Sequence, residues 1–107
     1  MTYLDTEIHK TASMLKRWQG HLATIYELNS SHSSLSVVIH GDSYGQNLVI
    51  ACLGPEYICG PTTWEDSCII LKTIELESSR EGIALLDERH NVKITAESFE
   101  IKENVKL

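Results

Sequence analysis

The sequence has no long hydrophobic run and no secretory signal. Its longest uninterrupted apolar segment covers residues 48–53, far short of the roughly 20 residues that a membrane-spanning helix needs. Asp5 and Glu7 stand where a secretory signal would carry basic residues followed by an apolar stretch. We therefore expect a protein that neither spans a membrane nor follows the secretory route, and we predict a cytoplasmic location.

Basic residues are also scarce, and they are not clustered. Nine Lys and Arg stand against fifteen Asp and Glu, the formal net charge is −6, and the longest basic cluster is the pair Lys16 and Arg17. Affinity for nucleic acids rests largely on Lys and Arg replacing condensed counterions, so this composition argues against a nucleic-acid partner. An acidic surface suits a basic protein partner, because long-range attraction speeds the encounter. The alternative is that the charge only keeps a small domain soluble.

Cysteine is present, but its pattern is neither that of a disulfide framework nor that of a metal site. Cys52, Cys59 and Cys68 are an odd number, which favours free thiols in a reducing compartment. Zinc-binding thiolates come in short pairs, whereas six and eight residues separate these cysteines and the five histidines are scattered singly. We predict neither a metal nor a cofactor.

Recognisable catalytic motifs are missing as well. The sequence contains no nucleophile elbow, no phosphate-binding glycine-rich loop before a helix and no His-Glu-x-x-His. Residues 59–61, Cys-Gly-Pro, match three of the four residues of the thioredoxin motif, but Thr62 replaces the second cysteine and no helix is expected to follow. We expect a binding protein; the alternative is a small enzyme that uses the thiol of Cys59, or His40 with Asp42, in a cleft.

Apolar residues at three- and four-residue steps predict one helix, from about residue 4 to Trp18. The stripe consists of Leu4, Ile8, Thr11, Ala12, Leu15 and Trp18. Thr2 and Asp5 have the spacing of a capping box, and Gly20 is a natural stop. We expect Trp18, which closes the stripe, to anchor this helix on the rest of the fold.

From His21 onward the periodicity is two, which is typical of half-buried strands. We predict strands over residues 22–28, 35–40, 47–53, 68–76, 82–88, 91–96 and 99–105, with turns at 29–34 and 41–46. No second helical segment follows, so the crossover helices that parallel strands require are missing. The predicted fold is α+β: a single domain, residues 1–107, with an N-terminal helix (about 4–18) packed on a curved, mainly antiparallel sheet (about 21–105) of six to eight short strands, similar to a sandwich or barrel.

Residues 52–61 read CLGPEYICGP and contain two Gly-Pro pairs, each shortly after a cysteine. Glycine permits unusual torsions, while proline fixes φ and removes a hydrogen-bond donor, so each pair is expected to end one strand and to redirect the next. We interpret the stretch as two corners of the sheet, with a very short strand or bend between them, rather than as a chemical site.

Aromatic and acidic residues gather around the second of these corners. Tyr57 and Trp64 flank it, with Glu56, Glu65 and Asp66 beside them. Aromatic anchors with a charged rim are common in protein interfaces, so we predict that these five residues bind another protein, which is basic. The alternative places Trp64 between the helix and the sheet. In its small size, acidity and lack of catalytic motifs, the chain is similar to an inhibitor or immunity protein for a basic enzyme, although it shares no motif with such proteins. The sequence is also compatible with a homodimer.

Overall fold

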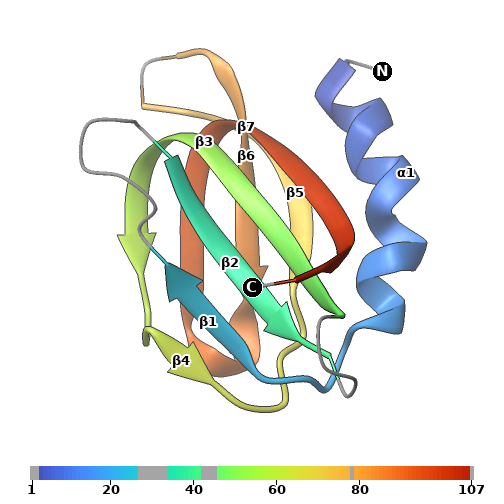
Figure 1. Cartoon of the computed structure of the whole chain (residues 1–107). Coiled ribbons are helices and arrows are strands. Elements are labelled where there is room, and N and C mark those ends of the chain that lie inside the picture. Colours follow the sequence, from blue (N-terminus) through green and yellow to red (C-terminus); the bar gives the residue numbers. More distant parts are fainter. Residues whose placement is uncertain (1–2, 27–33, 42–45, 78, 107) are drawn as a thin grey trace.

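The computed structural model describes residues 3–26, 34–41, 46–77 and 79–106. It contains one α-helix, one short 3-10 helix and seven strands (Figure 1). In chain order these are α1 (Tyr3–Arg17), β1 (Ala23–Tyr26), β2 (Ser34–His40), β3 (Asn47–Cys59), β4 (Thr63–Trp64), β5 (Ile70–Glu75), β6 (Glu81–Asp87), η1 (Glu88–His90) and β7 (Val92–Val105). The prediction of an N-terminal helix followed by a sheet is confirmed.

The seven strands form one antiparallel sheet in the order β4-β1-β2-β3-β7-β6-β5. Six of the strands form two meanders, β1-β2-β3 and β5-β6-β7, which join where β3 pairs with β7, and the short β4 is added beside β1. The sheet curves strongly around its own inner face but does not close, because β4 and β5 are its edges (Figure 1). The expected curved antiparallel sheet is therefore confirmed.

The hydrophobic core lies inside this curve. Its fully buried large aliphatic side chains come from β2, β3, β6 and β7: Val37, Ile39, Leu48, Ile50, Ile83, Leu85, Val92 and Ile94. Each such side chain contributes about 1.5–3 kcal/mol relative to exposure in water. From α1, Leu15 is buried in the same cluster and Leu4 and Ile8 pack against it, as does Trp18, which directly follows the helix. The helix runs along the β5 side of the sheet, as the predicted apolar stripe requires (Figure 1).

The end of α1 is tied to the last strand of the sheet. Trp18 Nε1 donates a hydrogen bond of 2.8 Å to Glu103 Oε2, and Arg17 Nη2 lies 3.1 Å from Glu103 Oε1. Trp18 is half-buried rather than fully buried, but it does connect the helix to the sheet as expected. Thr2, the first residue of the predicted capping box, lies outside the described residues.

The first Gly-Pro pair does not end a strand, which corrects the interpretation of two corners. β3 continues from Asn47 to Cys59, and its register shifts between Pro55 and Tyr57. Among the described residues, β2 pairs with β3 as far as Leu53, and Pro55 pairs with Ala96 of β7. Proline lacks the N–H that a strand paired on both sides uses, so in sheets it is confined to edges and bulges. Gly54 has a φ of +65° at this point. The second pair does follow a strand end, directly after Cys59.

The strands predicted over 91–96 and 99–105 are a single strand, β7, which is a second correction. Ala96 and Phe99, the apolar residues on either side of the predicted gap, have opposite parity along this strand. In the structure both residues contact the core, and Ala96, Ser98 and Phe99 all pair with β3 in the same register. The apolar residues thus change parity within one paired strand, close to the register shift between Pro55 and Tyr57 of β3.

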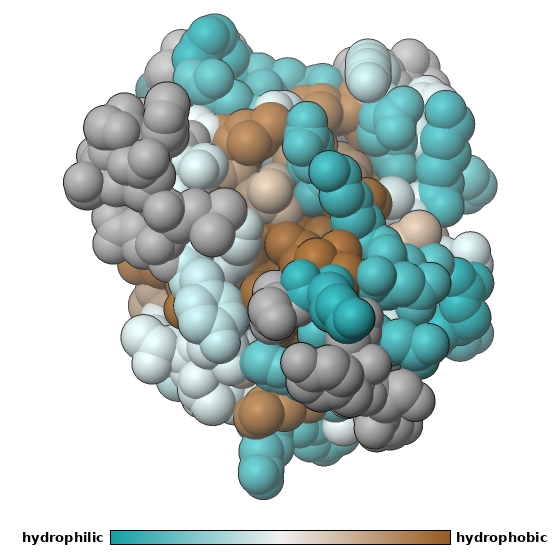
Figure 2. All heavy atoms as spheres, in the orientation of Figure 1, coloured by the Kyte–Doolittle hydropathy of each residue, from teal (hydrophilic) through white to brown (hydrophobic). Residues whose placement is uncertain are grey.

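The surface on the side of β1, β2 and β3 is mixed in character. Figure 2 shows apolar side chains in the middle of this face, over β2 and β3, between hydrophilic side chains. In the part of the chain that the structure describes, no helix has the length and apolarity to cross a membrane.

Candidate functional site

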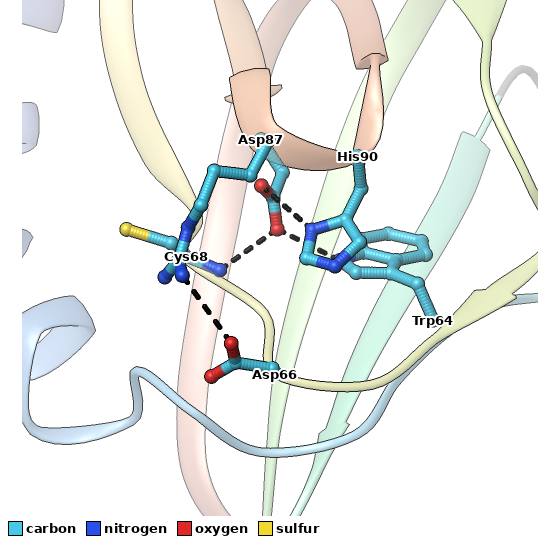
Figure 3. Close-up of polar contacts among 6 residues, drawn as sticks. Trp64, Asp66, Cys68, Asp87 and His90 are labelled. Carbon is cyan, nitrogen blue, oxygen red and sulfur yellow. Dashed lines mark hydrogen bonds and ion pairs between the residues drawn. The ribbon is translucent and has the colours of Figure 1, made fainter.

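The second Gly-Pro corner leads into a buried polar cluster around Trp64 (Figure 3). Trp64 is only 5% exposed, because its strand, β4, pairs with β1 at the rim of the core. Its indole Nε1 donates a hydrogen bond of 2.8 Å to Asp87 Oδ2. Trp64 is therefore a residue of the buried core.

Asp87 is the centre of this cluster and is fully buried at the end of β6. Its Oδ2 also accepts a hydrogen bond of 2.7 Å from the backbone N–H of Cys68, and its Oδ1 lies 3.1 Å from His90 Nδ1. Burial alone would raise the pKa of Asp87, but the hydrogen bonds from Cys68, His90 and Trp64 outweigh burial and lower that pKa. One carboxylate thus joins β4, the segment after it and the β6–β7 corner.

Glu65 and Asp66 lie on the surface beside this cluster, in the connection between β4 and β5. Asp66 has a positive φ of 52°, and its Oδ2 lies 3.3 Å from Arg89 Nη1 (Figure 3). A hydrogen bond with Cys68 and the charge of Asp66 both raise the pKa of Arg89. The negative charge of Asp66 is therefore partly balanced within the molecule.

Glu56 and Tyr57 lie elsewhere, in the second half of β3, where they line an acidic hollow of about 410 Å³. The acidic hollow is lined by Glu56, Tyr57, Glu75, Glu77, Lys93 and Thr95. Tyr57 is 50% exposed, and Lys93 Nζ lies 5.9 Å from the centre of its ring. A hydrogen bond with Cys59 raises the pKa of Tyr57. The structure thus divides the five predicted residues between the acidic hollow, the surface near Arg89 and the core.

Cys59 and His40, which represent the two alternative enzymatic sites, lie at opposite ends of β3. Cys59 is exposed at the last position of β3, whereas His40 pairs with Asn47 at the first position of the same strand. His40 Nε2 lies 3.1 Å from Thr24 Oγ1. Asp42, the proposed partner of His40, lies outside the described residues.

The three cysteines are free and differ in exposure. Cys52 is buried in the core, and burial raises the pKa of its thiol to about 12. It packs as a small apolar residue in the same buried cluster as Leu48 and Ile50. Among residues 3–26, 34–41, 46–77 and 79–106, no three His, Cys, Asp or Glu side chains are grouped as metal ligands would be.

Several residues of these sites were not identified from the sequence. Asp87 stands at the end of an almost uninterrupted apolar strand, and that position was a signal that its carboxylate would be buried. The pairing of β5, β6 and β7 brings three further residues to the acidic hollow: Glu75, Glu77 and Thr95. Local periodicity does not predict which strands pair, so these residues could not be assigned to the acidic hollow from the sequence.

Comparison with protein families, curated proteins and solved structures found no match for this chain.

Proposed function

We propose that the protein is a non-enzymatic binding module of the cytoplasm that holds a basic protein through its acidic hollow, as an inhibitor or immunity-type protein holds a basic enzyme. One observation carries the proposal: Glu56, Glu75 and Glu77 surround a concave surface that also presents the half-exposed ring of Tyr57. The aromatic side chain can contact an apolar part of a partner, and the surrounding carboxylates can pair with basic residues next to that part.

The charges around the acidic hollow favour it over the Glu65 and Asp66 surface. Glu75 and Glu77 form no ion pair with another described residue, whereas Asp66 already faces Arg89. The net charge of −6 adds a long-range field that attracts a cationic surface. Because salt at about 0.15 M confines such fields to roughly 8 Å, added salt should slow association more than it speeds dissociation.

The proposal is tested by placing a photo-crosslinking amino acid at position 57 of the full chain in its source cells. Tyr26 is the matched control, because it is also a strand tyrosine and is 43% exposed, against 50% for Tyr57. We expect one discrete adduct from position 57 and none from position 26. Equal adducts from both positions, or none from position 57, would contradict the proposal.

A pair of charge reversals then separates the two acidic surfaces. Glu56→Lys with Glu75→Lys changes the acidic hollow, and Glu65→Lys with Asp66→Lys changes the net charge by the same amount elsewhere. We expect only the first pair to abolish the adduct at position 57. Loss of the adduct with the second pair alone would move the interface to the β4–β5 connection.

A further inference from the structure

We infer that the acidic hollow receives one lysine side chain of the partner, and that Lys93 of this chain occupies the same position before the partner binds. This inference deepens the proposed function and rests on it. It names the chemical group that enters the acidic hollow, and it gives Lys93 the role of an internal competitor.

The first observation is the position of Lys93 itself. Its Nζ lies 5.9 Å from the centre of the Tyr57 ring, within the distance at which a cation is attracted by an aromatic face. Both residues line the acidic hollow together with three glutamates. The molecule therefore already holds an ammonium group at this place, on a flexible side chain that can move aside.

The second observation is a polar side chain that the fold leaves unused. Thr95 lies opposite Tyr57 in the pairing of β3 with β7 and lines the acidic hollow, although the residue is only 7% exposed. Its hydroxyl makes no hydrogen bond with another described residue. An ammonium group has three donors and no acceptor, so it can use this oxygen together with the surrounding carboxylates.

The third observation is a repulsive pair at the edge of the acidic hollow. Glu75 of β5 lies directly opposite Glu81 of β6 in the antiparallel pairing. Like charges in directly opposed positions destabilise a sheet. The fold thus retains an unfavourable concentration of negative charge at this place, and a bound cation would relieve it.

The chemistry of the acidic hollow selects a side-chain cation over other ligands. Phosphate and carboxylate ligands would be repelled by Glu56, Glu75 and Glu77. A divalent metal ion needs a compact set of ligands, and within the described ranges no such set of three side chains exists. A lysine combines a charged end for the glutamates with an apolar stem for the ring of Tyr57.

The experiment is a ¹H–¹⁵N NMR titration of the full chain with a short, capped peptide that contains a single lysine. The matched control peptide carries norleucine in place of the lysine, which removes the charge but keeps the stem, and a third peptide carries arginine. We expect the lysine peptide to shift the amide signals of Tyr57, Glu75 and Thr95, and the norleucine peptide to leave them in place.

Variants of the chain then test the role of the internal lysine. Lys93→Met should raise the affinity for the lysine peptide about two- to fivefold, because it removes a competing cation–aromatic contact. Glu75→Gln should lower that affinity, and Glu88→Gln, an exposed carboxylate outside the acidic hollow, should leave it unchanged. The NMR spectrum of each variant also reports whether the variant is folded.

Three outcomes would overturn the inference. In the first, Lys93→Met fails to raise the affinity; in the second, the lysine and norleucine peptides bind equally; in the third, the lysine peptide shifts Glu65 and Asp66 instead. Each of these outcomes is compatible with crosslinking of a partner at position 57, so the proposed function would survive it. Conversely, lysine binding in the acidic hollow without any crosslinked partner would contradict the proposed function and leave the cation site intact.

Discussion

Replacing Asp87 should destabilise the protein, because its carboxylate is the common acceptor of three hydrogen-bond donors. The alanine and asparagine variants should lose different amounts of unfolding free energy. In Asp87→Ala, the buried N–H of Trp64 and the backbone N–H of Cys68 lose their acceptor. Each unsatisfied buried donor costs about 1–3 kcal/mol, so we expect a loss of about 3–5 kcal/mol of unfolding free energy. Asp87→Asn keeps one oxygen for these two donors but removes the charge, which reduces the expected loss to about 2 kcal/mol.

The assay is urea unfolding followed by circular dichroism, repeated between pH 3 and pH 7. The pKa of Asp87 is lowered in the folded state, so its contribution is fully present above its ordinary value of 3.8 and is lost as the pH falls through the folded-state pKa. The difference between the wild type and Asp87→Asn should therefore be largest near neutral pH and should shrink below about pH 4.

Asp66→Asn is the matched control, because it removes an exposed carboxylate from the ion pair with Arg89. Its unfolding midpoint should equal that of the wild type within error, since exposed pairs contribute little. If Asp87→Asn unfolds at the wild-type midpoint, or if its deficit stays constant down to pH 3, the account of a buried, ionised acceptor is wrong.

Three further predictions concern the thiols, the helix anchor and the acidic hollow. In native protein, a thiol reagent at pH 8 should modify exposed Cys59 first and Cys52 only after unfolding; rapid native labelling of Cys52 would contradict its burial. Trp18→Ala should cost about 2–3 kcal/mol in urea melts, less than for a fully buried tryptophan, and a loss near zero would mean that the bond to Glu103 does not anchor the helix. Glu75→Gln should raise the unfolding free energy by a few tenths of a kcal/mol, because it removes one of two facing carboxylates, whereas a lower free energy would show that this pair is not repulsive.

The helix and most strands could be predicted from the sequence, because each is defined by a local period. The stripe from Leu4 to Trp18 specifies α1 within one residue at each end, since only a helix places these side chains on one face. Local patterns failed where pairing overrides them. Pro55 signals a strand end, yet β3 continues past it, because Pro55 pairs with Ala96 of β7 and the register shifts directly afterwards, between Pro55 and Tyr57.

The candidate site could be predicted only in part, for a related reason. Tyr57 and Trp64 are close together in the sequence, but side chains along strands point to alternate faces of a sheet. Tyr57 is therefore half-exposed, whereas Trp64 is buried. Glu56 adjoins Tyr57 in β3, but Glu75 and Glu77 come from the β5–β6 hairpin, which reaches β3 through β7. Such a meeting depends on sheet order, and no spacing within a single segment encodes it.

The junction between β3 and β7 has a consequence for how the chain folds. Each meander forms from neighbouring segments, whereas this junction joins distant ones; Asn47 and Val105, which pair in it, are 58 positions apart. Closing so long a loop is entropically costly, so we expect the two meanders to form first and their union to set the folding rate. Until then β3 and β7 each present a free edge. At high concentration, the β7 edge of one molecule can pair with the β3 edge of another, which makes exchange of whole meanders the characteristic misassembly of this fold.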